Sequence, residues 1–218
     1  PALSRAVVPG REEEFKTAFQ RHLKLVFIIT VPISLILFIL RVPAITVLLK
    51  HGAFDLSSLQ KTSTVLSGFS LSVIGQCVIY ISLRAFMAMG KMLVPMAISF
   101  ASAAINITAD ILLVKKVGLA GIGYGAIIGY TLNAILIIYS LHKILIFDLR
   151  KLIKEMTMIL LLNIPLAVIA AAADMFWGML ISRLCWGVQF LYLGISIFTS
   201  ITIYYININN CKLIKDCI

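Results

Sequence analysis

The chain has 218 residues, of which 61% are hydrophobic and 13% are charged, and its formal net charge is +10. A mean hydropathy of +1.05 leaves too few polar side chains to cover a soluble domain, which excludes an ordinary soluble enzyme. The basic residues lie between apolar runs rather than together on one soluble face, so nucleic acid is not an expected partner.

Six long apolar runs fill most of the chain. A run of about 18 or more apolar residues is typical of a transmembrane helix, because about 20 residues cross the hydrocarbon core. The runs are continuous rather than alternating, which favours helices over the strands of a barrel. The sequence therefore predicts an all-α, polytopic transmembrane helical bundle with six spans: 24–41, 63–88, 93–114, 119–141, 156–176 and 181–206.

The segment before the first span, residues 1–23, is polar. Acidic residues at 12–14 followed by Phe15, Phe19 and basic residues are typical of a helix whose macrodipole is complemented. We expect either a cytoplasmic interfacial helix or a solvated connector. The chain opens on Pro1 without a signal-peptide pattern, so we also expect a fragment whose N-terminal part is missing.

The first four spans, within residues 24–141, contain three local signals. Pro32 predicts a kink, which membrane helices tolerate, and the apolar segment 42–50 is too short to cross, so it is expected at the interface. Asp55 is placed to cap the next helix. Gly121, Gly125 and Gly129 recur every four residues on one helix face, which favours close helix packing.

The remaining sequence is predicted to hold a basic cytoplasmic loop over 142–155, two transmembrane helices over 156–206 and a cytoplasmic tail over 207–218. Tyr204 and Tyr205 suit an interfacial aromatic belt. Thirteen Lys and Arg residues fall on one side of the predicted membrane and six on the other, and the positive-inside rule places the first side in the cytoplasm. Both ends of this chain are then cytoplasmic.

Asp110 is the one acidic residue that lies well inside a predicted transmembrane span, four residues after Asn106. An i, i+4 pair shares one helix face, so both side-chain oxygens could bind one cation, such as Na⁺, or a proton. Alternatively, Asp110 lies near the helix end, where its side chain extends to water or pairs with Lys115 or Lys116. Asn106 alone would suit hydrogen bonding between helices.

Arg84 lies toward the cytoplasmic end of the second span. Its planar guanidinium could contact a substrate phosphate, or it could anchor the helix at the interface. No disulfide and no metal site is expected, because none of the four cysteines forms a C-x-x-C pair. Enzymatic signatures such as G-x-S-x-G, H-E-x-x-H and a Walker loop are absent from the sequence, so it is not expected to be an enzyme.

Several short motifs resemble the lipid II flippase family (MurJ, formerly MviN). They are the opening Pro-Ala-Leu-Ser-Arg with Gly10, the loop 48–54 ending in Gly-Ala-Phe, and Arg-Ala-Phe-Met-Ala at 84–88 followed by Pro95. Asn106, Gly118, Gly121 and Asn133 also fall where family members tend to have them. The resemblance covers about residues 1–145. Lys91, Val94 and Ala126 depart from the family pattern, and Ala126 stands where a hydroxyl residue is often found.

The resemblance implies the C-terminal part of a fourteen-helix, MATE-like transporter, with 24–141 in the second lobe and 156–206 as two extra helices. It implies a flippase that moves a lipid-linked peptidoglycan precursor (lipid II) to the outer leaflet by alternating access, in the bacterial cytoplasmic (inner) membrane. The implied partners are this lipid-linked murein precursor, membrane lipids and the missing N-terminal half. No cofactor is implied beyond a Na⁺ or H⁺ gradient.

The last two helices would form an apolar groove for the isoprenoid tail, with Leu161, Pro165 and Ala172 as candidate residues. Three alternatives remain open: a multidrug or polysaccharide exporter of the same superfamily, a membrane enzyme acting on lipid-linked sugar, and a non-transporting scaffold.

Overall fold

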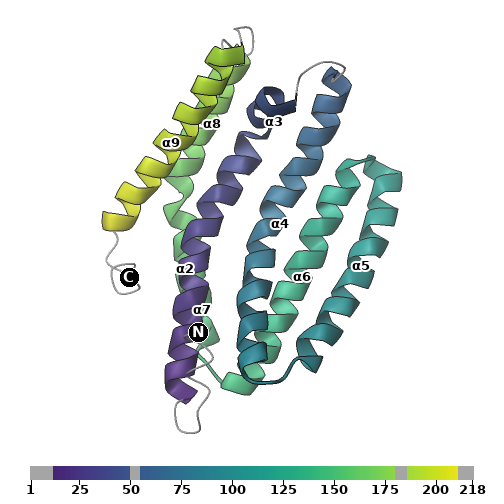
Figure 1. Cartoon of the computed structure of the whole chain (residues 1–218), viewed down its shortest axis with the longest axis vertical. Coiled ribbons are helices and arrows are strands. Elements are labelled where there is room, and N and C mark those ends of the chain that lie inside the picture. Colours follow the sequence, from purple (N-terminus) through teal and green to yellow (C-terminus); the bar gives the residue numbers. More distant parts are fainter. Residues whose placement is uncertain (1–11, 50–54, 180–185, 211–218) are drawn as a thin grey trace.

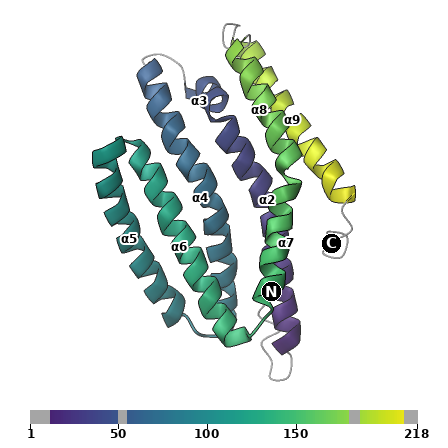
Figure 2. The same cartoon turned by 180° about the vertical axis from the view of Figure 1, so that it is seen from behind.

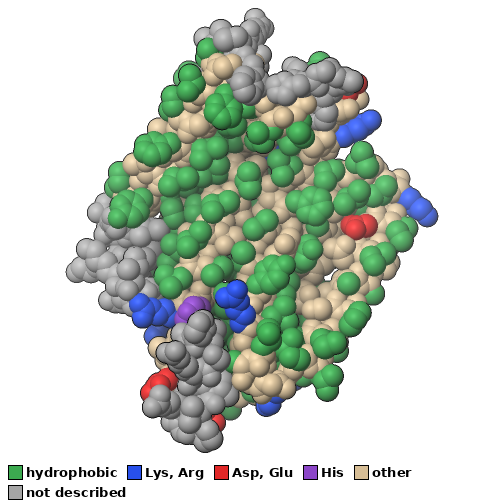
Figure 3. Space-filling view, viewed as in Figure 1, with side chains coloured by type: hydrophobic (Ala, Val, Ile, Leu, Met, Phe, Trp, Pro, Cys, Tyr) green, Lys and Arg blue, Asp and Glu red, His purple; other side chains and the backbone are tan. Residues whose placement is uncertain are grey.

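The computed structural model of the chain describes residues 12–49, 55–179 and 186–210, and every element within these ranges is a helix. Six helical stretches are long and apolar enough to cross a membrane. The predicted all-α transmembrane bundle is therefore confirmed. The helices run side by side (Figure 1), and charged side chains gather mainly near the helix ends while apolar ones cover the middle (Figure 3).

The first helix, α2 (Glu12–Ile39), begins well before the predicted span. Residues 12–23 form its first turns, so the charged segment enters the first span without a break. Phe15, Phe19 and Leu23 recur every four residues and are buried in a cluster with residues of α4, α6 and α7. The apolar face of this segment is thus covered by protein.

A short second helix, α3 (Arg41–Leu49), follows α2 after one residue. The break has a local cause, because Pro43 has no N–H with which to bond the carbonyl of Ile39. The sequence predicts a short interfacial segment over 42–50. Its residues up to Leu49 form α3.

Three antiparallel helices form the next layer: α4 (Leu56–Ala88), α5 (Leu93–Val117) and α6 (Ala120–Leu145). The α6 helix packs against both α4 and α5 and lies between them (Figures 1 and 2). Gly90 and Gly118 make the tight connections at φ +68° and +66°, a conformation that costs glycine little. As predicted, Asp55 caps α4: its carboxylate accepts the backbone N–H of Ser58 at 2.8 Å.

The structure differs from the loop expected over 142–155. The α6 helix continues to Leu145, three residues follow, and α7 (Leu149–Leu162) begins with Asp148 as its cap. This basic stretch is helical because α7 is amphipathic: Leu152 is buried while Arg150, Lys151 and Lys154 are directed away from the core.

The fifth span is a bent pair of helices, α7 and α8 (Ile164–Met179), which meet at the buried residue Asn163. Pro165 explains the bend, since it cannot donate a backbone hydrogen bond to Leu161. The last helix, α9 (Trp186–Asn210), packs on α8. Residues 180–185 and 211–218, and with them most of the predicted tail, lie outside the described residues.

The α8–α9 pair is joined to α2 and α3 by a second buried cluster, which includes Val31, Leu166, Trp177 and Tyr204. Tyr204 is therefore not part of an interfacial belt as expected. It is 7% exposed, and its hydroxyl donates to the carbonyl of Ile28 in α2 at 2.5 Å.

Candidate functional site

The glycine face of α6 is a packing surface for α5. The backbone of Leu113 and Val114 lies against Gly121, the carboxylate of Asp110 lies against Gly125, and the amide of Asn106 lies against Gly129. A Cβ at Gly129 would come within 2.6 Å of the Asn106 Cβ, so no larger residue fits without movement. The packing interpretation of the glycine repeat agrees with this geometry.

Asn106 and Asp110 share the face of α5 that meets this glycine row, and both are half-buried. The Asn106 amide nitrogen donates to the carbonyl of Gly125 at 3.2 Å. The Oδ1 atom of Asp110 is buried and accepts no hydrogen bond within the described residues. The ion pairs found in the same ranges are Lys16–Glu13 and Lys24–Glu155, so the alternative pairing of Asp110 with Lys115 or Lys116 is not formed.

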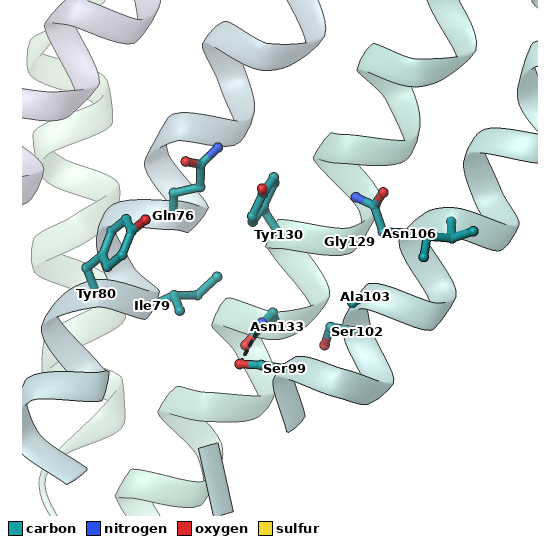
Figure 4. Close-up of a pocket in the computed structure, with 11 residues that line it drawn as sticks. Gln76, Ile79, Tyr80, Ser99, Ser102, Ala103, Asn106, Gly129, Tyr130 and Asn133 are labelled. Atoms are coloured by element: carbon teal, nitrogen blue, oxygen red, sulfur yellow. Dashed lines mark hydrogen bonds between the residues drawn. The ribbon is translucent and has the colours of Figure 1, made fainter. Parts of the chain in front are cut away.

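A polar cleft of about 390 Å³ extends along α5 from Asn106 in the direction away from Asp110. It lies over α6 and between α4 and α5 (Figure 4). Asn106 belongs to both features. The Asn133 amide nitrogen donates to the Ser99 hydroxyl at 3.4 Å, while the Asn133 Oδ1 and the Ser102 Oγ are buried without a partner in the described ranges. The polar residues lining the cleft are Gln76, Tyr80, Ser99, Ser102, Asn106, Tyr130 and Asn133.

Sequence reasoning missed most of these cleft residues. A signal was present, because Ser99, Ser102 and Asn106 recur at spacings of three and four and place polar groups on one side of an apolar span. Gln76 and Tyr80 repeat the pattern on α4. Seven polar side chains facing lipid would be costly, so this cleft is a place where water, a ligand or another polar surface belongs.

Arg84 lies one turn beyond Tyr80 on α4 and is exposed. It forms no hydrogen bond or ion pair with the described residues. It does not line the cleft. Because α4 and α5 run antiparallel, Arg84 and Asp110 lie toward opposite ends of the bundle (Figure 1). The structure does not join them into one site.

The three residues expected to hold an isoprenoid tail, Leu161, Pro165 and Ala172, are exposed on α7 and α8. None of the three lines the polar cleft or the separate apolar groove of about 780 Å³ that the described residues form between α7 and the α4–α6 pair. Residues of α7 from Leu149 to Leu160 form one wall, and Ile74, Val78 and Ile138 belong to the opposite wall.

Metal-ligand chemistry has no support in the described ranges, where no three His, Cys, Asp or Glu residues are placed around one point. Cys77 is free, and its sulfur accepts the hydroxyl of Thr30 at 3.3 Å. Cys185, Cys211 and Cys217 lie outside the described residues.

The family model and the relatives found by comparison with known proteins carry the same description. The family described as lipid II flippase MurJ matches residues 1–197. Lipid II flippase MurJ of Burkholderia cenocepacia is 24% identical over 143 residues, which are 66% of this chain and 28% of that protein. The probable lipid II flippase MurJ of Bdellovibrio bacteriovorus is also 24% identical over 143 residues, 66% of this chain and 27% of that protein.

A further relative, the probable lipid II flippase MurJ of Buchnera aphidicola, is 32% identical over 99 residues, 45% of this chain and 19% of that protein. The matched part of the chain thus spans little more than a quarter of the length of the first two relatives. The family match nevertheless extends over nearly all of the 218 residues. On this match, and with six membrane-spanning helices, the chain belongs to the lipid II flippase MurJ family.

Proposed function

We propose that this chain is the C-terminal part of a lipid II flippase, which moves a lipid-linked peptidoglycan precursor from the inner to the outer leaflet by alternating access. The observation that carries the proposal is the family match over residues 1–197 of a six-span bundle. Since the relatives are much longer, transport would require a further N-terminal lobe, against which this bundle would move.

The proposed orientation places both ends of this chain on the cytoplasmic side of the bacterial inner membrane. Supporting it, Arg21 and Lys24 near the start of α2 lie at the same end of the bundle as Lys143 and the basic residues 150–154 (Figure 1). An excess of Lys and Arg marks the cytoplasmic side of a membrane protein.

The Asn106–Asp110 pair is the proposed site for a driving cation. A buried carboxylate oxygen without a partner in the described residues, on the same helix face as an amide side chain, suits Na⁺ or a proton, because either would neutralise the charge. Ala126, on the facing helix, adds no side-chain oxygen, so the remaining ligands would be backbone carbonyls or groups from the other lobe. Arg84 is the proposed contact for the substrate pyrophosphate, since its planar donors match phosphate oxygens and no described residue pairs with them.

The isoprenoid tail has a better candidate site than the one expected from sequence. The groove between α7 and the α4–α6 pair is almost wholly apolar and runs along the bundle. We propose this groove for the tail, while Leu161, Pro165 and Ala172 on the outer face would meet membrane lipid.

Complementation tests this function directly. A bacterium depleted of its own flippase should regain growth and normal shape when it expresses the full-length gene that encodes this chain. Vesicles containing the protein should move fluorescent lipid II between leaflets. Failure in both assays, together with export of a drug or polysaccharide, would replace the proposal by an exporter of the same superfamily.

A further inference from the structure

A second polar pocket lies at the end of the bundle opposite to Arg84. It has a volume of about 320 Å³ and lies where α2 meets α3, between these helices, α4 and α6. Arg41 and the hydroxyl side chains of Thr64, Ser67 and Tyr124 line it, over an apolar base that includes Leu71. Of these residues, Leu71 also lines the apolar groove, whereas Arg41, Thr64, Ser67 and Tyr124 belong to none of the sites proposed above.

Arg41 is held toward this pocket rather than extended away from the bundle. Its Nη1 donates to the Phe38 carbonyl at 2.6 Å, and its Cζ lies 5.2 Å from the centre of the Phe38 ring. These contacts fix the guanidinium plane, and they use only one of its five N–H donors within the described residues. A fixed, planar set of donors is the arrangement that binds phosphate oxygens in pairs.

The charges around Arg41 do not cancel it by direct contact. Asp174 on α8 is the acidic residue that interacts electrostatically with Arg41, but the two form no ion pair within 4.0 Å. Asp55 is engaged at the N-terminus of α4 by Ser57 and Ser58. Lys61, exposed one turn before Thr64, adds a second positive charge on the pocket side of α4.

The hydroxyl groups complement a headgroup rather than a bare anion. The hydroxyls of Thr64 and Ser67 donate to the backbone carbonyls of Gln60 and Thr64, so their oxygen lone pairs remain to accept hydrogen bonds. Tyr124 lies one turn from the start of α6, at the level where tyrosines meet the membrane surface. The pocket thus offers a cation for phosphate next to acceptors for a hydroxyl or amine.

We propose that this pocket binds the phosphate of a lipid headgroup at the membrane surface remote from the start of α2. The shared chemistry is a phosphate ester attached to a lipid tail, either of a membrane phospholipid or of a lipid-linked pyrophosphate. The binding itself depends on neither the orientation nor the transport activity proposed above.

Native mass spectrometry of the whole chain in detergent tests the proposal with three probes: dioleoyl phosphatidylglycerol, undecaprenyl pyrophosphate and neutral dioleoylglycerol. Arg41→Gln removes the donors, and Ser67→Leu fills the pocket without changing charge. Lys116→Gln is the matched control, because it removes one exposed positive charge at the same end of the bundle. Circular dichroism confirms that each variant keeps its helix content.

We expect Arg41→Gln to weaken binding of at least one phosphate lipid by roughly tenfold or more, as loss of a charge-assisted hydrogen bond predicts. Ser67→Leu should weaken binding of the same lipid, because its side chain occupies the pocket. Dioleoylglycerol binding and the Lys116→Gln variant should be unchanged. The lipid that shows this dependence identifies the source of the phosphate. The proposal is overturned if Lys116→Gln weakens binding as much as Arg41→Gln, or if Ser67→Leu has no effect on either lipid.

Discussion

The hydroxyl of Tyr204 in α9 donates to the carbonyl oxygen of Ile28 in α2, and this carbonyl is the one that Pro32 leaves without an intrahelical donor. In a regular helix the N–H of residue 32 would bond the carbonyl of residue 28, and proline has no N–H. Because lipid offers no hydrogen bonds, an open carbonyl within a span needs a partner. Pro32 in the first span and the docking of the last helix on α2 are therefore parts of one structural feature.

Tyr204→Phe should lower the free energy of unfolding by about 1 kcal/mol, because the Ile28 carbonyl loses its donor in a buried setting. The effect should shrink in a Pro32→Ala background, where the restored backbone N–H bonds the carbonyl. Unfolding in mixed micelles, followed by circular dichroism, measures this cycle. Tyr205→Phe, at an exposed position on the same helix, is the control. Equal losses with and without Pro32 would refute the link.

The crossing of α4 and α6 at Gly68 and Gly123 should not tolerate a side chain. A methyl group on Gly68 would overlap the backbone of Gly123, and α4 cannot yield without losing its other contacts. Gly68→Ala should cost roughly 1–3 kcal/mol of stability, as overpacking does. Gly178→Ala in α8, where nothing lies within 4 Å, should be neutral or stabilising. A thermal unfolding scan of both variants in one detergent distinguishes the outcomes, and equal melting temperatures would contradict the close crossing.

The spans could be predicted from sequence because hydropathy and length are local properties of each run. The bent fifth span and the helical 149–155 segment could not be, since a Lys- and Arg-rich stretch resembles a loop unless its buried face is known. The burial of Tyr204 could not be predicted from the sequence either. It depends on a carbonyl 176 residues away that Pro32 leaves open.

The candidate site shows the same division. The i, i+4 spacing placed Asn106 and Asp110 on one face, and the glycine repeat indicated close packing. Neither pattern says that the two faces meet, or that Gly125 lies against Asp110. The polar cleft draws on three helices, so its residues are neighbours only after folding. Composition likewise cannot tell which sides of α7 and α8 face inward, and Leu161, Pro165 and Ala172, the residues expected to hold the isoprenoid tail, are exposed.

Sodium should stabilise the protein through Asp110 if the pair binds this cation. A ligand present at 100 times its Kd raises the unfolding free energy by about 2.7 kcal/mol. We expect the melting temperature to rise with NaCl but not with choline chloride, and Asp110→Asn to abolish the rise. Asp174→Asn, at another half-buried acid within a span, is the control. A rise that persists in Asp110→Asn would place the ion elsewhere, and a rise absent at all Na⁺ concentrations would favour the proton.

The capping of α4 by Asp55 should be lost in acid. The backbone N–H of Ser58 is the main cause that holds the pKa of Asp55 below its ordinary value of 3.8, with the hydroxyls of Ser58 and Ser57 assisting. A depressed folded pKa means that the stabilisation is complete above 3.8 and disappears as the pH falls through the folded value. The difference between the wild type and Asp55→Ala should therefore be largest at pH 7 and should shrink as the pH falls below 3.8.

Asp55→Asn is the matched control for this titration, because an amide caps a helix without changing charge between pH 3 and 7. Its difference in melting temperature from Asp55→Ala should stay constant with pH. If wild type and Asp55→Ala differ by the same amount at both pH values, then the carboxylate charge makes no contribution to the cap.

The ion pair between Lys24 of α2 and Glu155 of α7 should hold the two helices together more strongly than a surface pair. The atoms are 2.7 Å apart, and the side chains are only 17% and 14% exposed. Lys24→Gln leaves the mostly buried Glu155 carboxylate without its partner. It should lower the free energy of unfolding by roughly 1–3 kcal/mol, between the values for exposed and for buried pairs. Lys16→Gln, which breaks the pair with the 86% exposed Glu13, should cost less than about 1 kcal/mol.

Adding Glu155→Gln to Lys24→Gln should recover part of the loss, since no uncompensated charge then remains between the helices. Urea or SDS titrations of the four members of this cycle give the coupling free energy. A coupling near zero would mean that the apolar cluster around Phe19 and Leu152 alone joins α7 to α2. A large coupling would identify the Lys24–Glu155 pair as the contact that positions the α7–α9 segment against the rest of the bundle.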